Sequence, residues 1–379
     1  MATGSELKLD SLYVCTLDSK LGTGTQVDIS VIMPIFNQQE VLQHNLNKLA
    51  ASIRSKWELI LIDDSSTDGS LQVAQDWTKE APPQYQSLFR VRVIKTKHQV
   101  FETLCDAIGI SEATCPYVLE VQSDMEILEP GFDEKLLCAI KSHQDLLMIS
   151  GRGCHTLEEV TQSFTLELKK AKNGFFLSRL VAKEVLGFAN ALRGRVLLFI
   201  AELLSKTSSS VHGNSQAPEL SASEMGEALF PSLESFSLEG RAGRLGMLIE
   251  QDFKREDLIR NQMWLSETVM RGPLLIDKEK YVKAGGFDSR GFFLGNDDHD
   301  LAHRAYVSNG YRTAFVPIGF SSPLNLGSTR KRRSLHTLIL FSRSQKRTAK
   351  HMFNSGLYQL TQVEASANRP PREIRTFDY

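Results

Sequence analysis

The sequence predicts an α/β protein in which layers of helices enclose a mainly parallel central sheet. Between residues 28 and 127, short apolar runs alternate with segments whose apolar residues recur at helical spacing. Polar and acidic residues follow directly after several of these runs, as in "ELILIDDSSTDGS" at residues 58–70. Strand–helix–strand alternation at this spacing implies right-handed crossovers and therefore a mainly parallel sheet.

The expected elements of this first block follow one another with short connections. The run "DISVIMPI" predicts a strand that ends at Pro34, and the next apolar residues recur every three or four positions. In chain order, the pattern predicts a strand at 28–34, a helix around 42–53, a strand at 58–62, a helix at 68–79, a strand at 91–95, a helix at about 100–113 and a strand at 117–127.

A second organised block runs from about residue 262 to residue 323, and three segments fall outside the two blocks. Residues 1–27 show weak periodicity and are expected to be an irregular lead-in. Residues 156–261 begin with a helical pattern and continue into a polar, Ser-rich stretch, which indicates a long insertion. We therefore expect one domain over 28–330, with a basic tail at 331–379.

The composition and net charge of the chain indicate the general class of protein. The 379 residues are 41% hydrophobic and 23% charged, with a net charge of -1, so the chain has the composition of a globular protein and no global attraction to polyanions. Five scattered cysteines without Cys-x-x-Cys spacing indicate reduced thiols. The sequence shows no secretory signal and no apolar run long enough to span a bilayer. We expect a cytoplasmic protein, at most peripheral to a membrane.

Three acidic clusters each lie at the end of a segment of the chain: Asp63/Asp64, "QSDME" at 122–126 and "NDDHD" at 296–300. In a parallel sheet the carboxyl ends of the strands meet at one edge, which is where open α/β sheets bind ligands. Like charges gathered there need a cation or hydrogen-bond donors to stay ionised, and a divalent ion that binds together with a phosphorylated substrate would meet this need. Singly, Asp63 is equally well explained as a turn residue, and Asp68 is better explained as a helix N-cap.

The segments "ISVIMPIFNQQEVLQHNLNKL", "ELILIDDSSTDGS", "EVQSDMEILEPGF", "GGFD" and "GNDDHDLAHR" resemble family 2 glycosyltransferases in their order and spacing. The resemblance covers about residues 28–153 and 262–325 and omits the central segment. It implies a GT-A-like α/β/α sandwich that binds a nucleotide sugar, with a UDP-sugar as the expected donor.

The resemblance also implies the donor-binding residues. Pro34 and Phe36 match the end of the strand that meets the donor's base, and Asp64 matches the aspartate that accepts a hydrogen bond from the uracil ring. Gln122 replaces the first acid of the family's Asp-x-Asp motif and can still bind a ribose hydroxyl. Asp124 matches the metal ligand, for Mn2+ or Mg2+, with Glu126 as a supporting group.

Two further expectations follow from the same resemblance. Asp106 and Ala107 stand where the family often has Arg-Asn, so part of the usual donor contact set is missing or rebuilt. Asp298 matches the catalytic base, while Asp300 and Arg304 are expected to pair within the helix. A carboxylate at this position suits the chemistry, because a sugar hydroxyl must lose its proton as it attacks the anomeric carbon. A cation would neutralise the leaving diphosphate, and single displacement would invert the anomeric centre.

Alternatives remain open on the sequence alone. Gln122 and the missing Arg-Asn pair are also compatible with a catalytically weak, nucleotide-sugar-binding relative. His299 and His303 resemble the His-Glu-x-x-His zinc motif, which would indicate a zinc hydrolase. The basic stretch at 330–350 fits a solvated helix, a grip on donor phosphates or an anionic membrane surface. No nucleic-acid partner is expected, and neither the sugar nor the acceptor (glycan, lipid or protein) is identified.

Overall fold

The computed structural model describes residues 9–22, 27–80, 87–155, 261–321 and 373–379, together with residues 85, 347, 348, 350, 351 and 354. The expected insertion at 156–261, apart from its last residue, and most of the expected basic tail lie outside the described residues. In chain order the elements are η1 (Leu9–Ser11), β1 (Tyr13–Lys20), β2 (Ile29–Ile35), α1 (Leu42–Ser52), β3 (Trp57–Asp63), α2 (Ser70–Glu80), β4 (Leu88–Thr96), α3 (Glu102–Glu112), β5 (Tyr117–Glu120), β6 (Glu126–Ile127), α4 (Phe132–Ser142), β7 (Leu146–Ser150), β8 (Cys154–His155), β9 (Gln262–Ser266), β10 (Thr268–Val269), β11 (Leu274–Asp277), α9 (Lys278–Lys283), α10 (Asp297–Asn309), β12 (Arg312–Phe315), β13 (Phe320–Ser321) and β14 (Glu373–Thr376).

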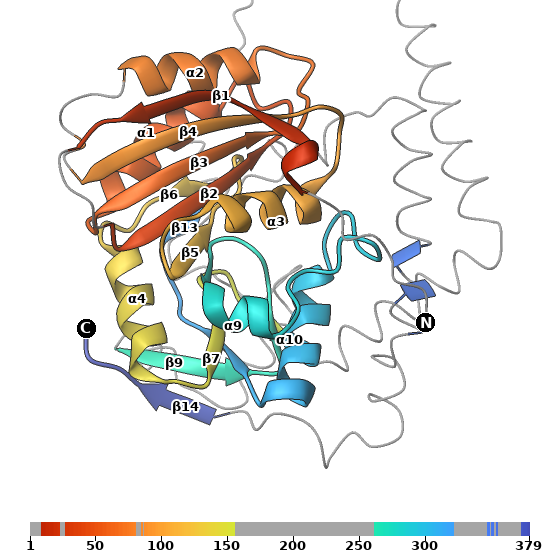
Figure 1. The fold of residues 1–379 in the computed structure, drawn as a ribbon. Coiled ribbons are helices and arrows are strands. Elements are labelled where there is room, and N and C mark those ends of the chain that lie inside the picture. Colours follow the sequence, from red (N-terminus) through yellow and green to blue (C-terminus); the bar gives the residue numbers. More distant parts are fainter. Residues whose placement is uncertain are drawn as a thin grey trace, which may run out of the picture.

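One ten-stranded sheet forms the centre of the molecule, in the order β1-β4-β3-β2-β5-β11-β7-β12-β9-β14 (Figure 1). The pairs β4–β3, β3–β2, β2–β5 and β7–β12 are parallel, and the remaining five neighbouring pairs are antiparallel. Following these pairings across the sheet, seven strands share one direction, and β1, β11 and β9 run the opposite way. The predicted α/β fold with a mainly parallel sheet is confirmed.

Helices cover both faces of the sheet, because successive side chains of a strand point to opposite faces. Val31 and Met33 of β2 pack with the apolar faces of α1, α2 and α4 in one core cluster. The intervening Ile32 packs in a second cluster with α3, α9 and α10. Each parallel strand is therefore apolar on both faces, which explains the continuous apolar runs that predicted them.

Three regions differ from the prediction. The expected irregular lead-in contains β1, an antiparallel edge strand whose mostly exposed side chains leave little periodicity to detect. The expected strand at 117–127 ends at Glu120, because the chain turns and the amide of Met125 bonds the carbonyl of Gln122. The far end of the expected tail forms β14, which pairs with β9.

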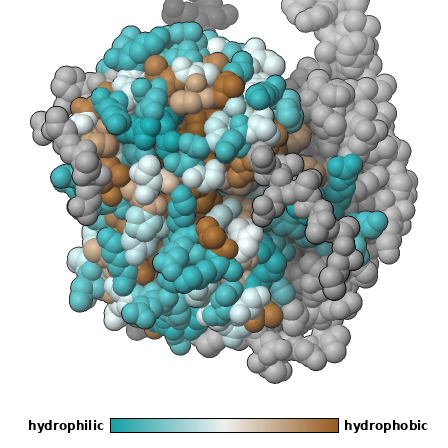
Figure 2. All heavy atoms as spheres, viewed as in Figure 1, coloured by the Kyte–Doolittle hydropathy of each residue, from teal (hydrophilic) through white to brown (hydrophobic). Residues whose placement is uncertain are grey.

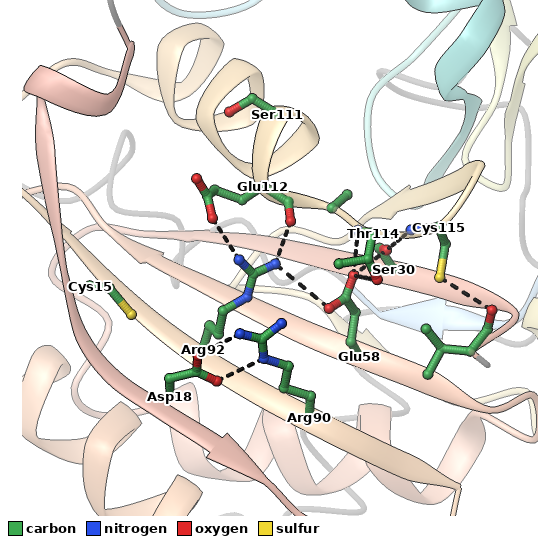
Figure 3. A network of polar contacts seen from close by, with 12 residues as sticks. Cys15, Asp18, Ser30, Glu58, Arg90, Arg92, Ser111, Glu112, Thr114 and Cys115 are labelled. Atoms are coloured by element: carbon green, nitrogen blue, oxygen red, sulfur yellow. Dashed lines mark hydrogen bonds and ion pairs between the residues drawn. The ribbon is translucent and has the colours of Figure 1, made fainter. Parts of the chain in front are cut away.

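A buried ion-pair network lies at the opposite end of the sheet from the strand ends that carry the acidic clusters (Figure 3). The guanidinium of Arg92 contacts Glu58 of β3 at 3.6 Å and Glu112 of α3 at 2.6 Å. Glu58 also accepts hydrogen bonds from Ser30 of β2 and from Thr114, the residue two positions past the end of α3. This network ties three strands and the end of α3 together, so it is a structural anchor of the fold.

The surface shown in Figure 2 intersperses hydrophilic and hydrophobic residues over the face seen in Figure 1. Among the described residues, no helix has the length and apolar character needed to cross a membrane. The buried apolar side chains of the described residues form the two core clusters.

Candidate active site

The loops that follow β2 and β3 are joined into one unit at the carboxyl edge of the sheet. The Asn37 side-chain oxygen accepts the Thr67 amide at 2.8 Å, and the Gln39 side-chain oxygen accepts the Gly69 amide at 2.8 Å. The amide of Gln38 donates to the Ser70 hydroxyl at 2.7 Å. Reciprocal bonds of this kind fix both loops without a ligand. They hold the half-buried Pro34 and Phe36 beside the acidic pair at 63–64.

Asp64 is only 4% exposed and accepts several hydrogen bonds from the protein itself. Its Oδ1 accepts the Val100 amide at 2.7 Å and its Oδ2 accepts the Phe101 amide at 2.9 Å. The Thr96 hydroxyl adds a third bond at 3.1 Å. Burial raises the pKa of this carboxyl, against the opposing effect of the two amides. Asp64 therefore anchors the loop before α3, and its predicted contact with a donor base stays a prediction.

Asp63 is fully buried and acts as a turn residue. Its Oδ2 accepts the Ser66 amide at 3.2 Å, and burial raises its pKa. Ser65, two residues after Asp63, has a positive φ of 54°. Positive φ angles also occur in neighbouring loops, at Asn37 (53°), Phe101 (70°) and Asn296 (70°). Backbone strain in residues other than glycine clusters at functional sites, and these four positions all lie in the loops of this edge.

The helix α3 brings Glu102 to the same edge. Close packing on the sheet positions this helix, since a Cβ at Gly109 would lie only 3.0 Å from the Ile32 side chain. Glu102 Oε1 accepts a hydrogen bond from Gln122 Nε2 at 3.0 Å, and Arg152 Nη1 donates to Gln122 Oε1 at 3.3 Å. The amide that replaces the first acid of the expected motif is thus held between a carboxylate and a guanidinium.

Asp124 lies half-buried in the turn that follows β5, two residues beyond Gln122. Glu126, its expected helper, faces α1 instead and forms ion pairs with His44 at 3.1 Å and Lys48 at 3.3 Å. The supporting role expected for Glu126 is therefore not favoured by its contacts. No set of three or more His, Cys, Asp and Glu side chains within the described residues is arranged to hold a metal ion.

Arg271 forms the centre of a buried charged cluster. This residue precedes the Gly272–Pro273 turn, and its side chain is 6% exposed. Its guanidinium pairs with Asp106 of α3 and with Asp297 of α10, and Glu102 lies 3.7 Å away. The Phe287 ring, with its centroid 4.9 Å from the guanidinium carbon, covers another side. Arg271 thus joins the two helices that flank the edge.

The three acidic residues in the first turn of α10 lie in different environments. Asp300 pairs with Arg304 at 2.7 Å, and Arg304 also bonds the carbonyls of Ala284 and Gly286, so the predicted internal pair is present. Asp297, in contrast, is fully buried against Arg271, and burial raises its pKa to about 6. Asp298 is 4% exposed, and its Oδ1 accepts the His299 amide at 2.9 Å. Asp297 therefore supports the site through Arg271.

Glu120 at the end of β5 adds a buried acid beneath the cluster. Burial raises its pKa well above the ordinary range, and the neighbouring charges of Glu102, Asp297 and Asp298 add to that effect. Neither carboxyl oxygen has a hydrogen-bond partner among the described residues. Burial therefore favours the protonated form of Glu120, and the charges that act on it come from Glu102, Asp297 and Asp298, which lie in the same region.

The zinc alternative finds little support in the positions of its two histidines. His299 Nδ1 lies 2.7 Å from the Thr268 hydroxyl. His303 is buried, which lowers its pKa to about 4. Within the described part of the chain, no third metal ligand joins these two histidines.

The structure thus links Gln122 to Glu102, Glu102 to Arg271, and Arg271 to Asp297, which is the sequence neighbour of Asp298. Asp64 accepts the amide of Phe101, the residue before Glu102. Sequence reasoning missed Glu102, Glu120, Arg152 and Arg271. Arg271 is not part of a recognised motif. Its position before a Gly-Pro turn in the second block is the one sequence feature that could have indicated it.

One family model and several known proteins are similar to this chain. Residues 30–193 match the model of a family described as "Glycosyl transferase family 2". A protein named as a glycosyltransferase, EpsE of Bacillus subtilis (strain 168), is 28% identical over 133 residues, which is 35% of this chain and 44% of that protein. Dodecaprenyl-phosphate galacturonate synthase of Rhizobium johnstonii is 26% identical over 117 residues, 29% of this chain and 33% of that protein. The chain spans less than half the length of these curated relatives.

The sequence identity to solved structures is lower than that to these relatives. A mannosyltransferase from Pyrobaculum calidifontis, solved with GDP-Man and Mn2+, has a TM-score of 0.43 and 12% identity over 90% of this chain and 76% of its own. The S. aureus TarS 1-349 structure with UDP has a TM-score of 0.37 and 14% identity over 76% of this chain and 57% of its own. The sequence match is the stronger finding: residues 30–193 are similar to glycosyl transferase family 2.

Proposed function

We propose that this protein is a glycosyltransferase that transfers a sugar from a nucleotide-sugar donor, expected to be a UDP-sugar, to an acceptor hydroxyl with inversion. One observation carries the proposal most directly. Gln122, at the expected donor position, contacts Glu102, and Arg271 lies 3.7 Å from Glu102 and pairs with Asp297, the neighbour of the expected base Asp298. We expect the loops after β2 and β3, with Pro34, Phe36 and Asp64, to form the donor side of the site.

The chain's own residues would divide the chemistry between them. Asp298 would accept the proton of the acceptor hydroxyl as that oxygen attacks the anomeric carbon. Asp297, pinned by Arg271, keeps the first turn of α10 in place while this happens. Asp124 is the residue that would hold a divalent cation, Mn2+ or Mg2+, and the donor diphosphate would complete the coordination, as is usual for magnesium sites with a single carboxylate. Such an ion would neutralise the charge that develops on the leaving diphosphate.

Release of nucleotide from a panel of donors tests the proposal. Purified protein is incubated with UDP-glucose, UDP-N-acetylglucosamine or GDP-mannose, with and without MnCl2, and free UDP or GDP is measured. We expect release from at least one donor and stimulation by the metal. Asp298→Asn should lower the rate by ~10²–10⁴-fold with UDP affinity preserved, since it loses basicity but keeps its shape. Asp124→Asn should remove the metal stimulation.

Each other result has a distinct meaning. Tight UDP binding without release from any donor would favour the catalytically weak relative, which the replacement of an acid by Gln122 suggests. An absence of UDP and GDP binding, measured by calorimetry with MnCl2 present, would contradict the proposed function as a whole. Tightly held zinc in the purified protein would favour the hydrolase built on His299 and His303.

A further inference from the structure

The Arg271 cluster is more than a buried ion pair between two helices. Its three carboxylates face a single guanidinium: Glu102 and Asp106 of α3, and Asp297 of α10. Asp106 and Asp297 are 1% and 0% exposed, whereas Glu102 is 20% exposed. Burying several like charges around one cation is costly, and well-packed apolar residues often serve stability better. The cost indicates that the cluster has a purpose beyond holding the fold together.

The position of the cluster suggests that purpose. Asn296, the residue before α10, has a left-handed backbone (φ 70°) and makes no side-chain cap bond to the helix. The pairing of Asp297 with Arg271 is therefore a direct side-chain restraint on the first turn of α10. Asp298 is the next residue in that turn, and its direction follows from the backbone that Asp297 holds. On the other side of Arg271, Glu102 receives a hydrogen bond from Gln122.

We propose that Arg271 is a positioning residue that sets the direction of Asp298 by clamping Asp297, and that keeps Glu102 in contact with Gln122 on the donor side. This inference rests on the proposed function, because it assigns to Asp298 the role of the base. Arginine suits the task better than lysine, since its planar, five-donor guanidinium can engage carboxylates on two helices at once.

The test compares two variants that each replace a buried arginine by lysine. Arg271→Lys keeps the positive charge and loses the planar guanidinium, so it should loosen the hold on Asp297. Arg92→Lys makes the same change in the Glu58–Arg92–Glu112 network at the opposite end of the sheet, where Arg92 is 7% exposed. A merely structural role would therefore affect the two variants in a similar way.

Two readouts are measured for each variant. In release of UDP or GDP from UDP-glucose, UDP-N-acetylglucosamine or GDP-mannose, we expect Arg271→Lys to lower kcat at least tenfold with KM changed by less than about threefold. Arg92→Lys should keep the kcat of the folded protein within about twofold of the wild type. In hydrogen exchange followed by mass spectrometry, a peptide spanning residues 294–305 should exchange faster in Arg271→Lys than in the wild type, and at an unchanged rate in Arg92→Lys.

Hydrogen exchange keeps the inference testable by itself. If Arg271→Lys leaves exchange in 294–305 unchanged, Arg271 does not hold the first turn of α10 and the inference is wrong, whatever the activity. Equal loss of kcat in both variants, in proportion to their folded fractions, would also overturn it, because it would show a structural role only. A wild-type protein that releases nucleotide from no donor would count against the proposed function, while the exchange result would still decide the clamp.

Discussion

Asp64 shows how a residue that matches a ligand-binding motif is also part of the scaffold. Its two oxygens accept the amides of Val100 and Phe101, so they hold the segment that leads into α3. Glu102, which contacts Gln122, begins that helix. The aspartate therefore shapes the candidate donor site even if the base of the donor never touches it. Its exposure of 4% makes this indirect contribution substantial.

Asp64→Ala should consequently lower both stability and nucleotide affinity. Removing the carboxylate leaves two backbone amides without acceptors, at ~1–3 kcal/mol for each buried group. We expect a lower free energy of unfolding in urea titrations and weaker UDP binding by calorimetry. The exposed Asp76→Ala is the matched control and should change neither quantity. Unchanged stability in Asp64→Ala would show that the loop before α3 does not depend on this residue.

Glu120 gives a pH-dependent prediction. Burial, with help from nearby carboxylates, raises its pKa well above 4.5, so the folded protein holds a proton that the unfolded chain releases. The favourable contribution of the neutral acid is present below the unfolded pKa and is lost as pH rises toward the folded pKa. Glu120→Gln is neutral at every pH and should escape this loss.

Urea unfolding of the wild type and Glu120→Gln at several pH values between about 5 and 8 measures the effect. We expect the stability advantage of the glutamine variant to grow with pH by up to ~1.4 kcal/mol per pH unit. The exposed Glu279→Gln is the control and should follow the wild type. An advantage that stays constant across this range would mean that Glu120 is ionised in the folded protein.

At the scale of elements, the far end of the chain is built into the sheet. Strand β14 pairs with β9 from Glu373 to Thr376, and Phe377 is 4% exposed within the larger core cluster. The amide of Phe377 bonds the carbonyl of Asn261, and the Tyr379 hydroxyl donates to the Gly131 carbonyl. These contacts make β14 the closing strand of the domain.

Phe377→Ala should therefore destabilise the domain strongly. Truncating a buried phenylalanine typically costs ~3–5 kcal/mol, through lost burial and the remaining cavity. Ile374→Ala, on the same strand but 38% exposed, is the matched control and should cost far less. Thermal unfolding of both variants checks the comparison. Similar melting temperatures for the two would indicate that the strand end frays in solution.

The elements also show what the sequence could and could not predict. The strands β2, β3 and β4 were predictable because both of their faces are buried, which produces continuous apolar runs. The edge strand β1 was missed because its side chains are mostly exposed. The site residues that were predicted belong to motifs, most of which follow strands. Arg271 and Glu102 were not predicted, because their roles depend on a contact between segments far apart in the chain.

At the scale of the whole molecule, the two ends of the sheet have different tasks. The Glu58–Arg92–Glu112 network anchors one end, while the loops of the opposite end carry the acids and Arg271. All ten strands of the main sheet, and all the predicted donor-binding residues, lie outside the segment 156–260. We expect this segment to select the acceptor.

Replacing residues 160–256 with a short Gly-Ser linker tests that division. Described residues before and after the segment lie close together, because His155 of β8 pairs with Thr268 of β10. We expect the shortened protein to keep UDP affinity within about threefold and to lose transfer to its acceptor. Calorimetry and circular dichroism measure the first expectation and the integrity of the fold. Loss of UDP binding by a folded variant would show that the segment forms part of the donor site.

The position of β11 between β5 and β7 has a consequence for how the protein is made. Both of these strands leave the ribosome long before residues 274–277, so each presents an unpaired edge until the later strand arrives. Pairing across so long a stretch of chain raises the contact order and slows folding. Exposed strand edges invite association between nascent chains. Fragments that stop before β11 should therefore aggregate, and efficient production should depend on chaperones that shield β5 and β7 during translation.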